Sequence, residues 1–479
     1  MKLYKQSIIY FICFFLFLST AFSAIKLPYF FSDNMVLQQK AQPLIWGWST
    51  ASSKLTLMTS WDKRKYTVTA DEKGKWKINV ATPAAGGPFE INIKEGSNSV
   101  VIKNILIGEV WLCSGQSNME MPMKGYGDQP ILGATDAVFN STNDQIRLYT
   151  MPMTVQRKPQ DTSISASWNA AEPASVTNFS ATAYYFGRLL QEKLKVPVGL
   201  ICISYGGTPV ESFMDEEALK AFPEINSYPS KKDTSKKISN GNATAVYNGM
   251  LHPFLGFSFK GCIWYQGESN CTNPQQYETL FPAFVKMLRT KSNNDSIPFY
   301  YAQIAPFNYG VNSPDLVPKF NSAYLRDAQR KALSAIPNSG MAVLMDVGAE
   351  NFIHPWDKET VGKRLAYMAL ARTYGFKGFP NASPMVESVN YGGNVATIQF
   401  TNAPNGLTSY GKPLSYFEIA GADKVFHPAR AIIFQGKLVV SAPEVLNPVA
   451  VRYAFRDFVA GDLFNTEGFP ASSFRTDDW

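Results

Sequence analysis

Residues 106–383 repeat one arrangement, in which a short apolar run that suits a buried strand precedes a longer amphipathic stretch. The apolar runs are residues 105–113, 196–204, 259–265, 298–304 and 341–347. Residues 181–194 and 274–290 carry apolar side chains at helical spacing, and a third helix is predicted after Pro355. Strands that alternate with helices form a parallel sheet covered on both faces, and sites in such sheets lie at the carboxyl ends of the strands.

The segments on either side of this region have β character. In residues 24–105, apolar and polar side chains alternate over 66–70 and again over 76–80, with a turn between them. In residues 384–479, a strand is predicted over 395–400, and a hairpin is predicted across Gln435-Gly436. We therefore expect an N-terminal β-sandwich-like domain over 24–105, an α/β domain over 106–383 and a C-terminal β domain over 384–479.

The first 23 residues have the pattern of a secretory signal peptide. Lys2 and Lys5 precede an apolar run of 11 residues, 8–18, and small residues follow at 21–24. The run is shorter than the roughly 20 residues that span a bilayer as a helix, and no later stretch suits a transmembrane segment. We expect a mature protein that begins near Ala24 and is periplasmic or extracellular.

Charge and cysteine usage exclude several classes of partner. The formal charge is +7, and +5 without Lys2 and Lys5, and its cations are scattered, which argues against nucleic acid. The sequence contains neither a C-x-x-C pair nor H-E-x-x-H, so no metal site and no cofactor are predicted. Cys262 and Cys271 are candidates for a disulfide in an oxidising compartment.

The apolar run at 110–113 stops at the polar stretch "SGQSN", which places Ser117 at the carboxyl end of a predicted strand. The pattern is not G-x-S-x-G, and a serine nucleophile requires a neighbouring base. The chain contains three histidines. His427 lies in the C-terminal segment, where we predict a loop, and His252 is assigned a structural role. His354 follows the last predicted strand of the sheet and is therefore the predicted base.

Acyl transfer also requires hydrogen-bond donors that face the oxyanion. The motif "ISYGGTP" places Gly206 and Gly207 after the second predicted strand, and "WYQGESN" places Gln266, Glu268 and Asn270 after the third. A single Gly-Gly pair is weak evidence, because turns often contain one. Glycine or polar clusters at four strand ends of one sheet are stronger evidence for a catalytic site.

The blocks "WLCSGQSNMEMP", "SYGGTPVESF", "WYQGESN" and "IHPWDKETVGKRLA" together resemble the sialate O-acetylesterase family within the SGNH (GDSL-like) hydrolases. The flanks "DNMVLQQ", "PLIWGW", "FEIAGADK" and "NPVAVRYAF" resemble the same family, so the similarity covers nearly the whole mature chain. The resemblance implies a three-layer SGNH-type fold, in which helices flank a parallel sheet, and a serine esterase without a cofactor.

The resemblance also implies roles for individual residues. Ser117 would attack an ester carbonyl, with His354 as general base and then general acid. Ser117 N–H, one glycine of the pair Gly206-Gly207 and the Gln266 side chain would hold the oxyanion. The polar cluster around Glu268 would orient this third donor. Which of the two glycines serves, and whether Gln266 or Asn270 is the third donor, stays open.

One position departs from the family pattern. Related enzymes often carry an aspartate two or three residues before the histidine, where this chain has Phe352 and Asn351. Loss of a triad carboxylate costs about 10⁴-fold in turnover when nothing replaces it. The amide oxygen of Asn351, or a backbone carbonyl, is a candidate to orient His354. Asp346 and Glu350 are near in sequence.

The resemblance, together with the predicted signal peptide, implies a secreted carbohydrate esterase that releases acetate from O-acetylated sugars or glycans, with 9-O-acetylated sialic acids as the preferred substrate. The alternative enzyme is an acetyl-xylan or other polysaccharide deacetylase with the same catalytic residues. The two differ because sialate carries a carboxylate and xylan backbone sugars are neutral. The alternative of another class is a non-catalytic sugar-binding protein, and a lipase or thioesterase is disfavoured because no long apolar lid segment occurs.

Overall fold

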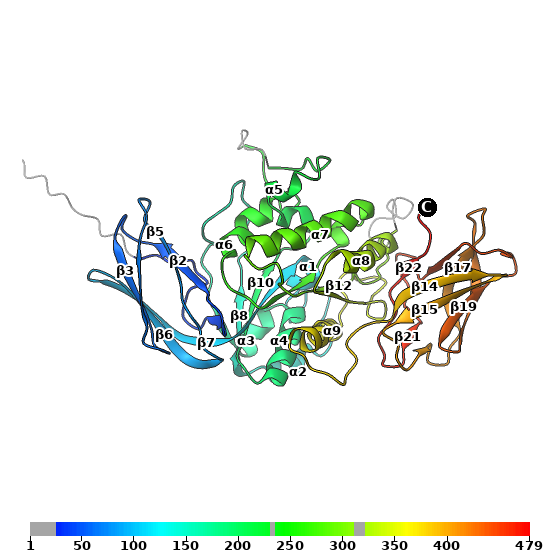
Figure 1. The fold of residues 1–479 in the computed structure, drawn as a ribbon, viewed down its shortest axis with the longest axis horizontal. Helices are drawn as coiled ribbons and strands as arrows, with labels where there is room; N and C mark the ends of the chain where they lie inside the picture. The colour runs from blue at the N-terminus through cyan, green and yellow to red at the C-terminus, as the bar shows by residue number, and fades with distance from the viewer. Residues whose placement is uncertain (1–24, 230–234, 311–320) are drawn as a thin grey trace, which may run out of the picture.

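The computed structural model describes residues 25–229, 235–310 and 321–479. The predicted signal peptide lies outside the described residues. The chain forms three parts in a row, with N-terminal β-structure at one end, a sheet with helices in the middle and C-terminal β-structure at the other end (Figure 1).

The middle part is built on a sheet with the strand order β13-β12-β11-β7-β10-β8-β9. Its strands are β7 (Asn98–Gly115), β8 (Asn143–Thr150), β9 (Asn169–Ala171), β10 (Val198–Ser204), β11 (Gly261–Tyr265), β12 (Phe299–Ala302) and β13 (Ser339–Ala342). Neighbouring strands pair in parallel, apart from β9, which is antiparallel to β8. The predicted α/β class is confirmed, and all five predicted strands are present. The sequence pattern did not predict β8.

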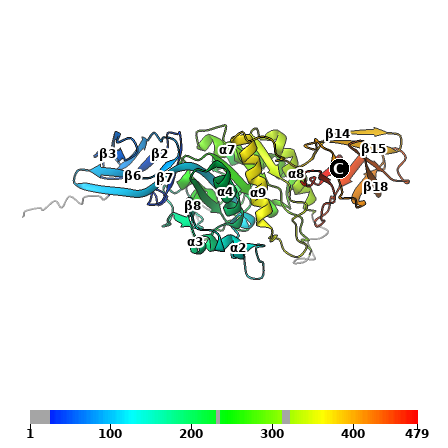
Figure 2. The same ribbon diagram turned by 90° about the horizontal axis from the view of Figure 1, so that it is seen from below.

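Helices cover both faces of this sheet. The longer helices are α4 (Ala181–Leu194), α7 (Pro274–Lys291), α8 (Ala323–Ala335) and α9 (Lys358–Met368). In Figure 1, α7 and α8 lie above the sheet, and Figure 2 shows α4 and α9 side by side on the lower face. The alternation of side chains along β7 explains the two layers, because Trp111 packs in the cluster that contains α4 and α9, whereas Leu112 packs in the cluster that contains α7 and α8.

Shorter elements complete the middle part. They are α1 (Ser117–Glu120), α2 (Ala134–Phe139), α3 (Pro173–Asn178), α5 (Glu216–Leu219), α6 (His252–Phe254), η1 (Val210–Phe213), η2 (Tyr247–Leu251), η3 (Glu268–Asn270) and η5 (Ala369–Thr373). The starts of two of the longer helices are capped by local hydrogen bonds. The Ser180 side chain accepts the Ala183 N–H at 3.1 Å at the start of α4, and Asp357 accepts the Thr360 N–H at 2.9 Å at the start of α9.

The N-terminal β-structure is continuous with the middle sheet through β7. The first half of β7 pairs with β6 (Gly86–Glu95), which pairs with β3 (Lys54–Thr59), which in turn pairs with β4 (Lys65–Thr69). β1 (Val36–Gln38) also pairs with β7, and β2 (Leu44–Trp48) pairs separately with β5 (Lys75–Asn79). The predicted boundary at residue 105 therefore falls inside one strand.

The C-terminal part contains an antiparallel sheet in the order β14-β15-β19-β18-β17-β20-β22. Its strands are β14 (Met385–Gly392), β15 (Val395–Thr401), β17 (Leu414–Ala420), β18 (Phe426–Phe434), β19 (Lys437–Ser441), β20 (Ala450–Tyr453) and β22 (Phe474–Arg475), and β16 (Leu407–Thr408) pairs with β21 (Phe464–Asn465). The predicted hairpin across Gln435-Gly436 is confirmed. His427 lies in β18, so its prediction as a loop residue is wrong.

The cysteines of the described residues are unpaired. Cys113, Cys202, Cys262 and Cys271 are all buried and free, so the suggested disulfide between Cys262 and Cys271 is not formed. The Cys271 thiol lies 3.4 Å from the Tyr309 hydroxyl, and the Cys262 thiol faces the Ile263 carbonyl.

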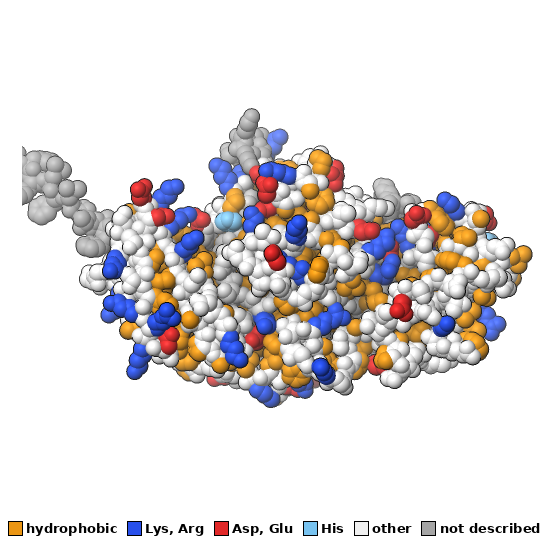
Figure 3. Space-filling view, viewed as in Figure 1, with side chains coloured by type: hydrophobic (Ala, Val, Ile, Leu, Met, Phe, Trp, Pro, Cys, Tyr) orange, Lys and Arg blue, Asp and Glu red, His pale blue; other side chains and the backbone are white. Residues whose placement is uncertain are grey.

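No helix in the described part of the chain is long and apolar enough to cross a membrane. On the face shown in Figure 3, Lys and Arg side chains are interspersed with Asp and Glu. This face therefore lacks the continuous basic surface that a nucleic-acid-binding protein presents.

We expect Gly362→Ala to destabilise the contact between α4 and α9. A Cβ at Gly362 would lie 2.7 Å from the Tyr185 Cβ and 2.8 Å from both the Phe186 nitrogen and the Thr182 carbonyl oxygen, and backbone atoms cannot move aside cheaply. The substitution should lower the free energy of unfolding by about 1–3 kcal/mol, measured by urea denaturation. Gly392→Ala, with open space around its Cβ, is the control and should unfold as the wild type does.

Candidate active site

The turn after β7 presents Ser117 at the carboxyl end of the central strand. At Gly115 φ is +141°, and a Cβ there would lie 2.1 Å from the Tyr265 carbonyl oxygen, so the close approach of β7 to β11 requires glycine. The buried Gln116 side chain accepts the Gly267 N–H at 3.2 Å, which fixes the turn after β11 against the turn after β7. Ser117 is half-buried at the first position of α1.

The structure brings His354 to this turn. Asn118 donates through its Nδ2 to the Ile353 carbonyl at 3.1 Å, across 235 residues of chain. The Tyr126 hydroxyl donates to the Ser117 carbonyl at 3.5 Å, and the Tyr126 ring meets the His354 ring edge-on with centroids 5.2 Å apart. The residues next to Ser117 and His354 are thus in direct contact, so the predicted nucleophile and the predicted base share one site.

Gln129 is the orienting partner of His354. Its Oε1 lies 2.6 Å from Nδ1 of the imidazole. Because a carboxamide oxygen can only accept, Nδ1 carries the proton in this tautomer and Nε2 keeps the lone pair of a base. Among the described residues, Asn351 forms no hydrogen bond with His354, and its side chain is exposed. Asp346 is held by Arg364 in a bidentate pair at 2.7 and 2.6 Å.

The environment of His354 favours the neutral imidazole. Burial, and then the positive charge of Lys358, lower the pKa of His354 from its ordinary value of 6.5 to about 4. A neutral imidazole is the form that can accept a proton from a serine hydroxyl. The ring is therefore in the basic form at neutral pH.

Of the two candidate glycines, Gly206 lies beside the serine. A Cβ at Gly206 would be 3.4 Å from the Ser117 Cβ, whereas Gly207, at φ +67°, faces the Asn240 side chain. The Gly206 N–H donates to Oε2 of Glu120 at 2.5 Å. The Gly206 N–H, a predicted donor to the oxyanion, is thus hydrogen-bonded to a carboxylate oxygen.

The predicted third donor is already satisfied. The buried Gln266 donates through Nε2 to the Asn270 Oδ1 at 2.7 Å and to the Thr208 carbonyl at 3.2 Å, and its Oε1 accepts the Tyr277 hydroxyl at 3.0 Å. Asn270 in turn donates to Glu211 at 3.0 Å. Both N–H groups of the Gln266 amide are therefore used within the strand ends, and Asn270 gives one N–H to Glu211.

Glu268 and Lys358 approach Asn118 from opposite sides. Glu268 accepts the Asn118 Nδ2 at 2.6 Å, and within the polar cluster around Glu268 it is Asn270 that accepts from the Gln266 amide, at 2.7 Å. The Lys358 ammonium donates to the Asn118 Oδ1. Burial raises the pKa of Glu268 and lowers the pKa of Lys358 to about 7.

The other two histidines lie outside this site. His252 has its Nδ1 2.8 Å from the Gln160 carbonyl and packs against the Tyr247 ring, as expected of a structural residue. Among residues 25–229, 235–310 and 321–479, no group of three or more His, Cys, Asp or Glu side chains is arranged to hold a metal ion.

Comparisons with known proteins show the family to which the chain belongs. Residues 107–370 match the model of a family described as carbohydrate esterase, sialic acid-specific acetylesterase. The sialate O-acetylesterase of Homo sapiens is 29% identical over 391 residues, which cover 75% of this chain and 73% of the human protein. The crystal structure of a carbohydrate acetylesterase from Xanthomonas citri has a TM-score of 0.85 at 32% identity, covering 95% of this chain and all of the other.

The chain belongs to the sialic acid-specific acetylesterase family. It is an esterase that hydrolyses O-acetyl esters. The resemblance stated from the sequence blocks is thereby confirmed. The family model covers Ser117, the glycine pair, Gln266 and His354 in one continuous match.

Four residues of this acetylesterase site were missed by sequence reasoning: Glu120, Tyr126, Gln129 and Lys358. Gln129 lies in the loop between α1 and α2, and no local pattern indicates a partner 225 residues away. Lys358 lies in the charged run "WDKETVGKR", which is typical of a solvated helix start. Glu120 and Tyr126 follow Ser117 closely, and proximity to the nucleophile was the one signal available for them.

We expect the imidazole of His354 to titrate well below the ordinary histidine pKa of 6.5. Burial and the nearby ammonium disfavour its protonated form, so its proton NMR signal should keep the chemical shift of the neutral ring from pH 7 to pH 5 and move with a midpoint near 4. The signal is assigned by its loss in His354→Asn. A midpoint at 6.5 or above would contradict the environment described here.

Proposed function

We propose that this protein is a serine carbohydrate esterase in which Ser117 and His354 form a catalytic dyad supported by Gln129. The single observation that carries the proposal is the hydrogen bond of Nδ1 with Gln129, which leaves Nε2 as a base on the ring that adjoins the serine turn. His354 Nε2 takes the proton of Ser117 as its Oγ attacks the acetyl carbonyl. The imidazolium then protonates the leaving sugar hydroxyl, and an acetyl-serine remains.

The second half of the reaction uses the same groups. Water attacks the acetyl-serine as His354 accepts its proton, and the imidazolium returns a proton to Ser117, which releases acetate. The imidazolium of both steps is stabilised by the Gln129 carboxamide oxygen. A neutral amide does this less strongly than the aspartate of a full triad, whose loss costs about 10⁴-fold when nothing replaces it.

For the oxyanion we propose the N–H groups of Ser117 and Gly206. Ser117 is the first residue of α1, where a backbone N–H has no partner within the helix. The Gly206 N–H becomes available when the substrate carbonyl oxygen displaces the Glu120 carboxylate. Helices on both faces of the parallel sheet support the finer prediction of a three-layer SGNH-type fold.

The substrate we propose first is a 9-O-acetylated sialic acid, because the curated relatives are sialate O-acetylesterases. A neutral acetylated polysaccharide such as acetyl-xylan is the second candidate, favoured by a specific observation. The charged side chain that lies against Ser117 and Gly206 is the Glu120 carboxylate, which repels the carboxylate of sialate. Because a signal peptide is predicted, we propose that the enzyme acts in the periplasm or outside the cell.

Ser117→Ala should abolish acetate release from p-nitrophenyl acetate, and His354→Asn should lower kcat by about 10³-fold or more, because nucleophile and base act as one unit. Rates on 9-O-acetyl-N-acetylneuraminic acid and on acetylated xylan, measured as acetate released, then rank the two substrates. Unchanged turnover in Ser117→Ala would refute the serine mechanism. Binding of these sugars without turnover by the wild type would instead indicate a sugar-binding protein.

A further inference from the structure

A buried chain of polar contacts joins three segments behind the catalytic pair. Lys358, the first residue of α9, is fully buried and donates to the Asn118 Oδ1. The Asn118 Nδ2 donates to the Glu268 Oε1 at 2.6 Å and to the Ile353 carbonyl at 3.1 Å. Asn118 follows the nucleophile directly, and Ile353 precedes His354 directly, so one carboxamide links the two catalytic segments.

The orientation of this carboxamide is fixed by the charges on either side. An ammonium can only donate, whereas a carboxylate and a carbonyl can only accept. The Asn118 oxygen must therefore face Lys358, and its NH₂ group must face Glu268 and Ile353. The reversed amide would lose every one of these bonds. Glu268 and Lys358 thus lock the link between the serine turn and the histidine loop.

Burial makes the two charges depend on each other. Glu268 Oε2 is buried without a hydrogen-bond partner among the described residues, and its nearest compensating charge is Lys358. The Lys358 ammonium also lies 5.5 Å above the centroid of the Tyr265 ring, which adds a cation–π contact. Removing either charge alone would leave the other uncompensated in a site of low dielectric constant.

We propose that Lys358, acting through Asn118 together with Glu268, is a positioning residue that holds His354 and Ser117 in their reactive arrangement. The inference rests on the proposed function of that pair. The Lys358 charge has a second effect, because it lies close enough to His354 to disfavour the imidazolium. Other groups around the ring are Tyr126 and Gln129 from the loop after α1 and, among carboxylates, Glu120 behind Tyr126, Glu268 of η3 and Asp357 before α9.

Lys358→Met keeps the length of the side chain and removes the ammonium. We expect kcat on p-nitrophenyl acetate to fall about 10- to 100-fold with KM changed less than about twofold, because displacement by about 1 Å can cost 100-fold. The acidic limb of the pH profile of kcat/KM should move to higher pH, because the imidazolium is no longer repelled. Lys363→Met, on the exposed side of α9, is the matched control and should leave both quantities unchanged.

The double variant Lys358→Met/Glu268→Gln removes both buried charges and guards against failure of the single variant to fold. If the double variant folds, the acidic limb of its kcat/KM profile should lie at higher pH than that of the wild type, as in Lys358→Met. A folded Lys358→Met or double variant with wild-type kcat and an unmoved acidic limb would overturn this inference. If that happens while Ser117→Ala is inactive, the dyad stands and the positioning role alone fails.

A second and independent feature is a groove of about 840 Å³ at the end of the central sheet that is opposite the candidate active site. Lys260, Pro298 and Asn338 precede β11, β12 and β13, so the groove lies at the amino ends of strands whose carboxyl ends form the active site. The N-terminal β-structure supplies its other wall through the segment from Gln38 to Leu44 and through β5.

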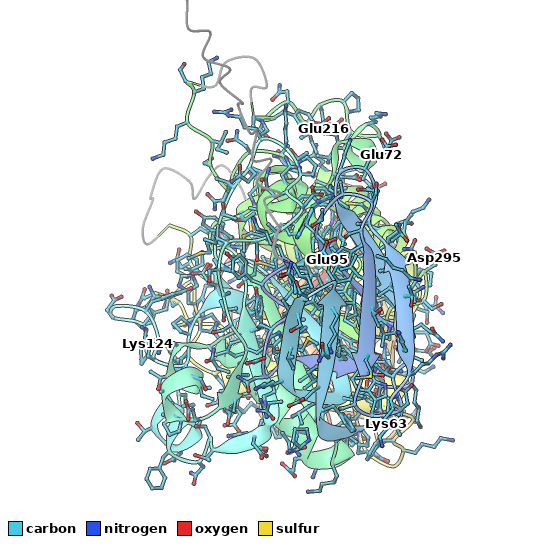
Figure 4. The ribbon with its side chains drawn as sticks, turned by 90° about the vertical axis from the view of Figure 1, so that its left-hand side faces the viewer. Lys63, Glu72, Glu95, Lys124, Glu216 and Asp295 are labelled. Carbon is cyan, nitrogen blue, oxygen red and sulfur yellow. The ribbon has the colours of Figure 1, made fainter. Side chains whose placement is uncertain are left out.

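The lining of this groove is cationic and rich in amides. It contains Lys40, Lys77, Lys260 and Arg372, seven Asn or Gln side chains and no Asp or Glu. None of these four cations forms a salt bridge in the part of the chain that the structure describes, although Lys260 lies 5.9 Å above the Tyr374 ring. Asp295, labelled in Figure 4, lines a neighbouring cavity rather than the groove.

An adjoining hollow adds tryptophan side chains. It shares Leu44 and Lys77 with the groove and includes Trp46 and Trp48, together with the carboxylates of Asp71 and Asp161. The pairing of β2 with β5 sets Trp46 opposite Lys77, so aromatic and cationic side chains share one face of this two-stranded sheet. Amides bind sugar hydroxyls, rings pack on sugar faces and cations bind carboxylates. The groove, whose lining has no carboxylate, therefore suits an acidic glycan, with the Trp46 ring beside it.

We infer that this groove is a second, non-catalytic site for an oligosaccharide that carries carboxylates. In isothermal titration calorimetry at low salt, a galacturonic acid oligosaccharide should bind, and Lys77→Ala/Lys260→Ala should weaken it about 10-fold or more, with unchanged turnover of p-nitrophenyl acetate. The control pair Lys63→Ala/Lys65→Ala alters cations of the N-terminal β-structure outside the groove, and Lys63 is labelled in Figure 4.

Three results would overturn the assignment of this groove. One is equal binding of a neutral xylo-oligosaccharide, and another is equal binding of a single-stranded oligonucleotide, because either would show that carboxylate-bearing sugars are not what the groove selects. The third is unchanged affinity of the double variant for the galacturonic acid oligosaccharide.

Discussion

The arrangement of the molecule depends on one strand, β7, which runs through two sheets. Its first half completes the N-terminal β-structure through β6, and its second half is the centre of the parallel sheet, between β10 and β11. From Ile105 to Gly115 every residue of β7 is buried. Backbone hydrogen bonds on both edges and apolar contacts on both faces leave this strand little freedom to shift its register.

The position of the serine turn follows from this constraint. Because β7 ends at Gly115 between two other strand ends, Ser117 emerges where the turns after β10 and β11 also arrive. The polar side chains of these turns bond to each other: Gln116 to Gly267, Asn118 to Glu268 and Gly206 to Glu120. Buried polar groups stabilise one geometry only when every member finds a partner, and this cluster meets that condition with few exceptions.

Much of the fold was predictable because its signals are local. Apolar runs of seven to nine residues indicated the strands of the central sheet, and helical spacing indicated α4 and α7. Ser117 and His354 could be proposed because strand ends attract catalytic residues and because histidines are few. β8 escaped prediction because its first half, "NDQI", is polar and lies at the side of the sheet where β9 pairs irregularly.

The contacts that orient the site were not predictable, for a physical reason. Asn351 was a candidate by proximity in sequence, but the ring nitrogen is reached by Gln129 from a different loop. Gln266 matched the family block, but Tyr277 on α7 and Asn270 satisfy its amide. Lys358 resembles a solvated lysine in the sequence and is buried because Asn118, Glu268 and Tyr265 surround it. Such roles depend on which segments, distant in the sequence, come into contact, and a local sequence pattern does not predict these contacts.

The free thiols described above have a consequence for how this enzyme acquires its shape. Burial raises the pKa of Cys113, Cys202, Cys262 and Cys271, which leaves them protonated and poorly nucleophilic. No covalent cross-link between them contributes to the architecture of the described residues. The fold of the described residues therefore does not require oxidation of these four thiols.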